Sequence, residues 1–510
     1  MKSRFGGKLV AAGVATAVAG SLLMIAPAQS APALSTAPVV IARTTDIDKV
    51  DPHVATAFPT VHTLGLVYGT LVELDANLKV VPGLASSWKF SDDNKTITFY
   101  LRKNVTFHNG AKFTSADVKA SFDRILKPAT AAVGRSNYTS INRIVTPDAN
   151  TVVFILNDPS VPLLAAMTDV NASIASAADI KSGAVAKKPN GTGPFTWKAW
   201  KAGQSVTLSA NTKYWGAKPK ISGVVFRVIP TEASALAAVN AGSAQMALIS
   251  DPLIARTATK RVTTQRYGSL SYHALMLNSR KGALKDVNVR LAIQCSIDRG
   301  AVLKTSALGE GTVTGPFNMA AYKSNVNSRP CPTRDLAKAK SYLAAAGNPT
   351  VKLETIVTQT GFATSVAEAQ ALQAQLKDAG ITLDLVVLDH ATYVKRWLDG
   401  DFDAAVANNG GRVDPDTMYR RYFTSVGNLN KVAGYSSDTL DALFAQGVAT
   451  DNYTKRKDIY TKISVELEKN AAWVWLFSLS EYVIHSPKVT GFKTMSNGSL
   501  LTLRSASLQK

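Results

Sequence analysis

Residues 68–126 read YGTLVELDANLKVVPGLASSWKFSDDNKTITFYLRKNVTFHNGAKFTSADVKASFDRIL. A cluster of Ser, Asp and Asn at residues 91–95 favours a turn, and the apolar residues on both sides of it alternate with other residues. Trp88 and Phe90 stand before the cluster, and the alternation resumes at Ile97. Because a period of two places these side chains on one face of a strand, the stretch predicts a β-hairpin.

A helix is predicted directly after the hairpin. Thr114 is a suitable N-cap, and Asp117 stands three residues later, where a capping-box partner is expected. Val118, Phe122 and Ile125 follow at helical spacing and predict one buried stripe. The run is therefore a well-formed mixed α and β module, and it contains no evident reactive group of its own.

The run also resembles a known family in the order and spacing of five segments, namely Tyr68–Leu71, Pro82–Trp88, Thr98–Arg102, Phe107–Gly110 and Thr114–Val118. They are similar to the corresponding segments of the family 5 extracellular solute-binding proteins, the dipeptide-, oligopeptide- and nickel-binding receptors of bacterial ABC importers. The resemblance extends over most of the chain and is also strong at residues 190–215 and 277–300.

The remaining pattern predicts an α/β fold. Residues 221–249 and residues 351–407 each show apolar strand segments alternating with helical segments, with short connections, which indicates two lobes with a sheet each. The resemblance implies a bilobal clamp in which the first lobe carries an inserted mixed subdomain. The expected division is a signal peptide at 1–30, the first lobe at 31–67, 191–275 and 478–510, the inserted subdomain at 68–190 and the second lobe at 276–477.

The amino terminus has the pattern of a targeting segment. Lys2, Arg4 and Lys8 precede an apolar stretch at residues 9–25, and small residues lead to a predicted cleavage after Ser30. A retained membrane anchor is the alternative. No cysteine stands near the cleavage site, so we expect no lipid anchor there. The mature protein is expected to be exported to the periplasm or the outer face of the cell envelope.

The composition argues against several classes of protein. The formal net charge is +21, which could favour anionic ligands or proximity to anionic cell-wall polymers. The basic residues are spread evenly, so nucleic acid is not an expected partner. The chain has no HExxH, GxSxG or Walker sequence, and its histidines are isolated. We therefore expect no catalytic residue, no metal and no cofactor, and we interpret each histidine as a surface or packing residue.

Two cysteines, Cys295 and Cys331, stand far apart in the sequence. In an oxidising compartment such a pair often forms a disulfide, and two reduced buried thiols are the alternative.

The resemblance also implies where a ligand would bind, and there the chain departs from its peptide-binding relatives. Gly411 occupies the place of the Asp that holds a peptide amino terminus, and Gln359 stands near the place of an Arg that holds the carboxylate. Both ionic anchors are therefore absent, and we expect free dipeptides to bind weakly. Asn408, Asn409 and Gln359 instead offer neutral donors and acceptors.

Two charged residues, Arg412 and Asp414, and several aromatic residues are further candidates for the ligand-binding site. Arg412 could bind an anionic group bidentately, or it could be a solvated loop charge or pair internally with Asp414. Four aromatic residues are candidate apolar walls, although each could equally lie in a core: Phe58, Tyr138, Trp397 and Tyr419.

The predicted function is an extracytoplasmic receptor that captures a small solute, peptide-like or otherwise polar, between its lobes. Its expected partners are this ligand and the permease subunits of an ABC importer, and we expect a monomer. A secreted hydrolase or an envelope structural protein on the same fold is the alternative.

Overall fold

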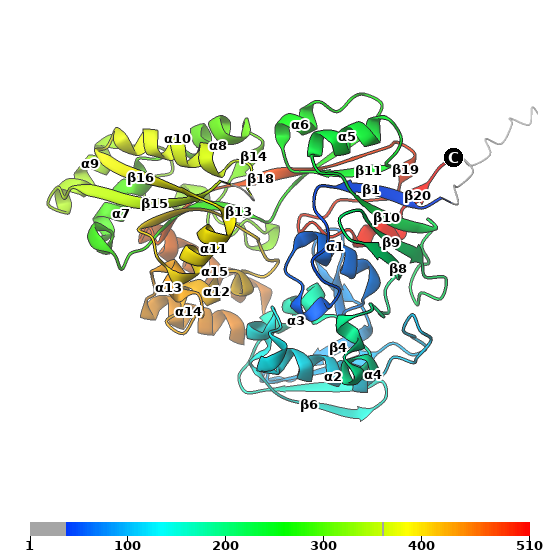
Figure 1. The fold of residues 1–510 in the computed structure, drawn as a ribbon. Coiled ribbons are helices and arrows are strands. Elements are labelled where there is room, and N and C mark those ends of the chain that lie inside the picture. Colours follow the sequence, from blue (N-terminus) through cyan, green and yellow to red (C-terminus); the bar gives the residue numbers. More distant parts are fainter. Residues whose placement is uncertain (1–36, 360–361) are drawn as a thin grey trace, which may run out of the picture.

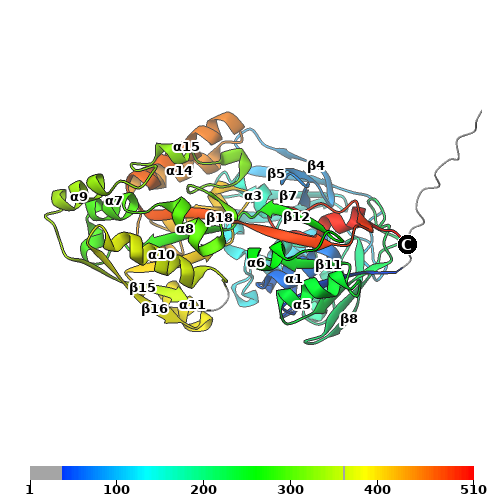
Figure 2. The same cartoon turned by 90° about the horizontal axis from the view of Figure 1, so that it is seen from above.

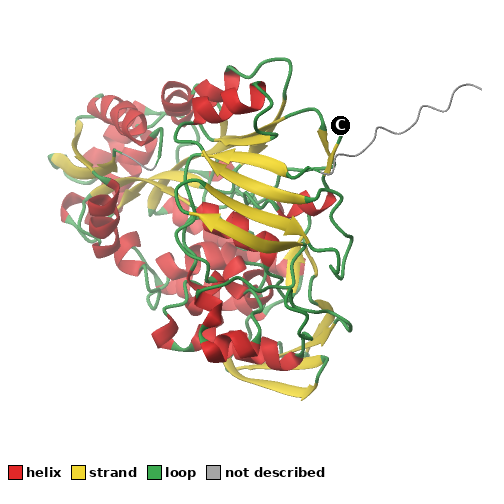
Figure 3. Ribbon diagram, turned by 45° about the vertical axis from the view of Figure 1, so that its right-hand side comes forward, coloured by secondary structure: helices red, strands yellow, loops and turns green. Residues whose placement is uncertain are grey.

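The computed structural model describes residues 37–359 and 362–510, so the predicted signal peptide at residues 1–30 lies outside the described residues. Two lobes stand side by side, and a further body of helices and strands lies below the first lobe (Figure 1). Strands run through the middle of the molecule, with helices above and below them (Figure 3). The predicted bilobal α/β class is confirmed.

The opening stretch of sequence folds into the predicted hairpin and helix, within the body that we call the inserted subdomain. Strands β4 and β5 pair as an antiparallel hairpin, and α2 begins after the Thr114 cap with both halves of the capping box present. The sheet order is β4-β5-β7-β6, and α2 packs on β6 and β7. The elements of this body are β2 (Val72–Leu74), β3 (Val80–Pro82), β4 (Ala85–Phe90), β5 (Thr96–Leu101), α2 (Ser115–Leu126), β6 (Ile141–Asp148), β7 (Thr151–Leu156), α3 (Pro162–Ala166) and α4 (Ala177–Ser182).

The first lobe contains the predicted strand–helix–strand unit. Strands β10 and β11 both run parallel to β1, which lies between them, and α5 packs against β1 and β11. Its elements are β1 (Val39–Arg43), α1 (Phe58–Val67), β8 (Phe195–Lys201), β9 (Ser205–Ala210), β10 (Gly223–Val228), α5 (Glu232–Asn240), β11 (Met246–Ile249), α6 (Pro252–Arg256), β12 (Thr263–Gly268), β19 (Val489–Thr490) and β20 (Ser507–Leu508).

The second lobe repeats this architecture. Strand β15 runs parallel to β16 and β17, and α10 covers all three. Its strands are β13 (Tyr272–Leu277), β14 (Gly311–Val313), β15 (Val351–Thr358), β16 (Ile381–Leu388) and β17 (Ala404–Asn409). Its helices are α7 (Val287–Cys295), α8 (Arg299–Ala307), α9 (Leu336–Ala345), α10 (Ser365–Lys377), α11 (His390–Asp399), α12 (Pro415–Phe423), α13 (Asn430–Ala433), α14 (Asp438–Ala449) and α15 (Tyr453–Lys469).

One strand joins the sheets of the two lobes. Strand β18 (Trp473–His485) pairs with β13 through Trp473–Phe477 and with β11 through Tyr482–His485. Seen from above, it crosses from one lobe to the other (Figure 2). The apolar run at residues 471–477 predicts a strand that ends at Phe477, whereas β18 continues to His485. Within the described residues, twelve strands thus belong to one sheet with β18 at its centre, so the prediction of a separate sheet in each lobe is wrong.

No helix within residues 37–359 and 362–510 has the length and apolar character needed to cross a membrane.

The structure joins Cys295 and Cys331 in a disulfide that lies in the core of the second lobe, closing a loop with a sequence separation of 36. We expect replacement of both cysteines by serine to lower the free energy of unfolding by about 3 kcal/mol, because the crosslink restricts the unfolded chain. Urea denaturation of the double-serine variant, and of the wild type with and without reductant, measures this loss of stability. An oxidised wild type that is no more stable than its reduced form would contradict the expectation.

Candidate ligand-binding site

A cavity of about 400 Å³ lies between the lobes, and we call it the Asn409 chamber. Phe58 and His62 of α1 contribute from the first lobe, and β13 and β17 contribute from the second. Because both lobes supply its walls, a ligand held here would link them, as expected of a clamp.

Strand β17 delivers two of the predicted residues to this chamber. Asn408 and Asn409 pair in register with His273 and Tyr272 of β13, and both asparagines line the cavity. The Nδ2 of Asn409 is buried and lacks a hydrogen bond of good geometry within the described residues, although its amide group interacts with the hydroxyl of Tyr272. A buried donor without such a hydrogen bond destabilises the protein. A ligand that places a hydrogen-bond acceptor against Nδ2 would therefore be bound more tightly.

A buried histidine–carboxylate pair lies beside these asparagines. The Nδ1 of His273 is 2.9 Å from Oε1 of Glu368, and both side chains are almost fully buried. Thr364 donates a hydrogen bond to the same carboxylate, and the imidazole stacks on Phe477. The carboxylate of Glu368 favours the tautomer of His273 that carries its proton on Nδ1. The other ring nitrogen, Nε2, then remains for a partner in the chamber, whose wall includes His273. The sequence predicts only a surface or packing role for His273, because its partner Glu368 is 95 positions away along the chain.

The two glycines after β17 differ in the space around them. A Cβ atom at Gly411 would lie 1.7 Å from the carbonyl oxygen of Leu270, whereas at Gly410 the nearest atom would be Cζ of Phe58 at 4.0 Å. Position 411 therefore has no room for an acidic side chain. Glu481 also lines the chamber, and its carboxylate accepts a hydrogen bond from Tyr267 at 2.7 Å.

Arg412 lies in a second cavity, of about 330 Å³, which we call the Arg412 chamber. Its Nη1 is 3.0 Å from Oδ2 of Asp169, which belongs to the inserted subdomain. The pair spans the space between the inserted subdomain and the second lobe. The internal partner of Arg412 is thus Asp169 and not Asp414.

Asp414 has a structural role instead. Its carboxylate caps α12 and forms two hydrogen bonds with Arg456 of α15, at 2.6 and 2.9 Å. Next to it, burial raises the pKa of Asp416 to about 7, and Tyr460 donates a hydrogen bond to this side chain. These groups lie among the helices of the second lobe, so Asp414 is not free to contact a ligand.

The predicted aromatic walls are mostly core residues. Phe58 is 63% exposed and lines both the Asn409 and the Arg412 chamber. Tyr138 is fully buried and donates to the carbonyl of Ala166, whereas Tyr419 is fully buried and accepts a hydrogen bond from Trp475. The structure thus gives these two tyrosines the core position that the sequence left open as their alternative.

Two further predicted residues also lie outside these chambers. Trp397 packs against the core of the second lobe, with its Nε1 3.3 Å from the sulfur of Met276. Gln359 is exposed, and its backbone N–H donates to the carbonyl of Leu388 at 2.8 Å, which extends the pairing of β15 with β16. Neither residue therefore contributes to the walls of the Asn409 or Arg412 chamber.

Within the described residues, no group of three or more His, Cys, Asp or Glu side chains is placed to hold a metal ion. The Asn409 chamber instead combines neutral amide groups, an imidazole, backbone groups and the single carboxylate of Glu481 around a space that both lobes enclose. Two α/β lobes, a crossing strand and a cavity between the lobes define a bilobal ligand-binding protein.

Comparison with known proteins identifies the family. The model of the bacterial extracellular solute-binding proteins, family 5, matches residues 79–430. The chain therefore belongs to this family and is an extracellular solute-binding protein, as the resemblance in its sequence predicted.

Individual relatives bind different ligands. The chain is 30% identical to the probable D,D-dipeptide-binding periplasmic protein DdpA of Escherichia coli, covering 80% of this chain and 81% of that protein. It is 28% identical to heme-binding protein A of Haemophilus influenzae, covering 84% of both. Among solved structures, the Helicobacter pylori binding protein DppA in complex with the peptide STSA is 27% identical, with a TM-score of 0.79 over 92% of this chain and 98% of that one.

Proposed function

We propose that this protein is the extracytoplasmic receptor of an ABC importer, that it performs no catalysis, and that it binds an uncharged polar group of its solute in the Asn409 chamber. The family and its relatives support the receptor role. The observation that carries the ligand class is the contact between the Cβ position of Gly411 and the backbone of Leu270, which leaves no room for the amine anchor. The amide of Asn409 supplies a neutral donor in its place.

A binding screen tests this proposal. We expect N-acetylated peptides and other solutes without a free ammonium group to raise the melting temperature, and free dipeptides to leave it unchanged. Loss of one hydrogen bond through Asn409→Ala should weaken binding of the best solute about three- to ten-fold in calorimetry. Asn77→Ala, a change at an exposed position that lines neither the Asn409 nor the Arg412 chamber, is the matched control.

Two outcomes would contradict the proposal. One is tight binding of free dipeptides. Such binding would point to Glu481, the carboxylate in the wall of this chamber, as the partner of the ammonium group. The other is an Asn409→Ala variant that binds the best solute as well as the wild type and the Asn77→Ala control do.

The cellular setting belongs to the same proposal. The family is extracellular, which supports export. We further propose cleavage after Ser30, where small residues follow the apolar stretch, and a mature protein without a lipid anchor, since no cysteine stands near that position. We propose that it acts as a monomer that delivers its ligand to permease subunits.

We also propose the lobe division given by the sequence, with its boundary at residue 275 moved to the start of β13, because all of β13 pairs within the second lobe. The first lobe is then 31–67, 191–271 and 478–510, the inserted subdomain is 68–190 and the second lobe is 272–477. The pairing of β18 supports a passage between lobes near residue 478, since β13 is its partner up to Phe477 and β12 from Ser480.

A further inference from the structure

The cleft continues beyond the two chambers described so far. A third cavity, of about 560 Å³, lies between the inserted subdomain and α12, and we call it the Arg420 chamber. The Asn409 and Arg412 chambers share Phe58 and Gly410 in their walls, and the Arg412 and Arg420 chambers share Thr417 and Arg421. The three chambers therefore lie next to one another along the cleft, and we call them together the groove. Their combined volume exceeds the roughly 300–1,000 Å³ typical of a small-ligand pocket.

Arg421 is the cation at the junction of the last two chambers. Its guanidinium carbon lies 4.8 Å from the ring centroid of Tyr422, which holds the group over an aromatic face. Its Nε is buried without a hydrogen-bond partner, and no carboxylate of the described residues forms an ion pair with it. Arg412 in the same groove differs, because Asp169 neutralises its charge.

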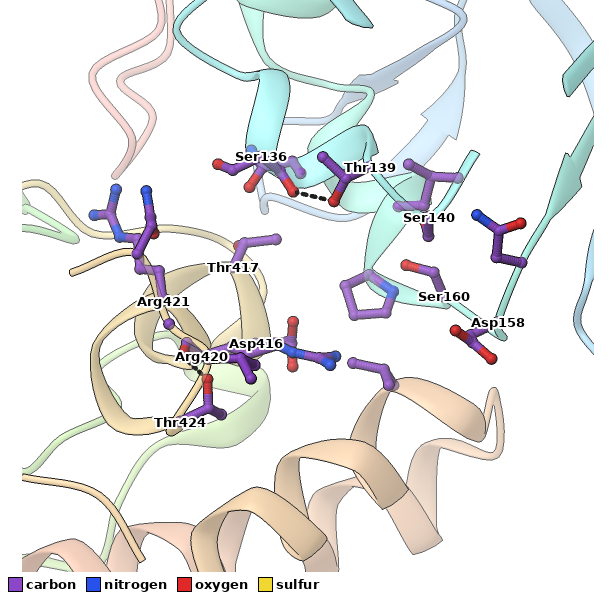
Figure 4. A pocket seen from close by; sticks show the side chains of 18 of the residues that line it. Ser136, Thr139, Ser140, Asp158, Ser160, Asp416, Thr417, Arg420, Arg421 and Thr424 are labelled. Carbon is purple, nitrogen blue, oxygen red and sulfur yellow. Dashed lines mark hydrogen bonds between the residues drawn. The ribbon is translucent and has the colours of Figure 1, made fainter. Parts of the chain in front are cut away.

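A half-buried cation without a counter-ion is unfavourable, and an anionic ligand group would remove that penalty. The neighbouring Arg420 chamber suits the same ligand chemistry. Figure 4 shows the side chain of Arg420 extending from α12 toward the opposite wall, where Ser140 and Ser160 lie. The hydroxyl of Ser140 is buried and has no hydrogen-bond partner in the described part of the chain.

Two carboxylates also line this chamber, and they limit its positive charge. Asp158 lies on the wall opposite Arg420 (Figure 4). Asp416 carries only part of a negative charge near neutral pH, because burial raises its pKa to about 7. With Arg135 as a third arginine in the wall, the cations still outnumber the carboxylates.

We propose that the solute is elongated and anionic, with an uncharged polar part in the Asn409 chamber and a carboxylate or phosphate group on Arg421. This inference rests on the proposed function of the Asn409 chamber. It assigns to Arg421 the role of anion partner that the sequence left open for Arg412.

Calorimetry with a series of N-acetylated oligoalanines, from the dipeptide to the octapeptide, tests the inference. Each peptide is measured in two forms, one with a free C-terminal carboxylate and one with a C-terminal amide. We expect acid and amide to bind equally when the peptide is short, and the acid to bind about ten- to hundred-fold more tightly once the chain reaches Arg421. Arg421→Gln should abolish this advantage, and Arg421→Lys should retain part of it. Arg143→Gln, which removes an exposed arginine of β6, is the control for net charge.

The possible results distinguish a failure of this inference from a failure of the proposed function. If acid and amide bind the wild type equally at every length, or if the advantage of the acid survives in Arg421→Gln, the inference is overturned while the Asn409 chamber keeps its role. If only peptides with a free amine bind, the proposed function itself fails. A matching series ending in a phosphate monoester distinguishes the two anionic groups by which one gains more from Arg421.

Discussion

Gly411→Asp is expected to destabilise the protein by about 3 kcal/mol or more and to leave free dipeptides unbound. A Cβ atom at this position would lie 1.7 Å from the oxygen and 2.3 Å from the carbon of the Leu270 carbonyl group. Both atoms belong to the backbone, so the clash cannot be relieved by turning a side chain, and the strand connection itself must move. Urea denaturation followed by tryptophan fluorescence measures the loss.

Gly410→Asp is the matched control for that substitution. The Cβ position there meets nothing closer than Phe58 at 4.0 Å, so this variant is expected to fold normally. Its carboxylate would enter the wall shared by the Asn409 and Arg412 chambers, and we expect at least ten-fold tighter binding of free dipeptides than in the wild type. A Gly411→Asp variant as stable as Gly410→Asp would contradict the expectation.

Arg456→Met is expected to have the second large effect, a loss of about 3–5 kcal/mol of unfolding free energy. The side chains of Arg456 and Asp414 are only 5% and 8% exposed, and removal of the arginine leaves the carboxylate buried without its partner. Burial alone would lower the pKa of Arg456, but Asp414 raises it overall, which shows how strongly the pair favours the charged state.

A double-mutant cycle isolates the coupling between these residues. Arg456→Met with Asp414→Asn should be more stable than Arg456→Met alone, because the charge of Asp414 is then no longer left buried without its partner. Lys462→Met is the control, since its pair with Asp458 is about 60% exposed and should contribute less than about 1 kcal/mol. An Arg456→Met variant no less stable than Lys462→Met would show that the buried pair is dispensable.

The parts of the fold that could be predicted from sequence are those with local signals. The hairpin of β4 and β5 and the helix α2 follow from alternation, a turn cluster and a capping box within a single short run. The strand–helix–strand units follow from the same kind of pattern. Strand β18 was predicted too short, because Ser478 and Ser480 interrupt its apolar run although both are buried in the sheet.

The site was harder to predict, because its contacts join distant parts of the chain. His273 acquires its role from Glu368, and Arg412 is neutralised by Asp169 on another body of the fold. Neither Glu368 nor Asp169 can be recognised as a partner from the sequence around His273 or Arg412. Sequence alone also cannot distinguish a cleft aromatic such as Phe58 from a core aromatic such as Tyr419, since both are large apolar residues.

The position of β18 has a consequence for the order in which the protein can assemble. This strand lies between β13 of one lobe and β11 of the other, yet it is the last long strand to leave the ribosome. Until residues 473–485 are made, each half of the sheet lacks its neighbour at the junction. The chain should therefore remain incompletely folded until nearly all of it has been synthesised, a state that suits a protein that must be threaded across a membrane before it closes.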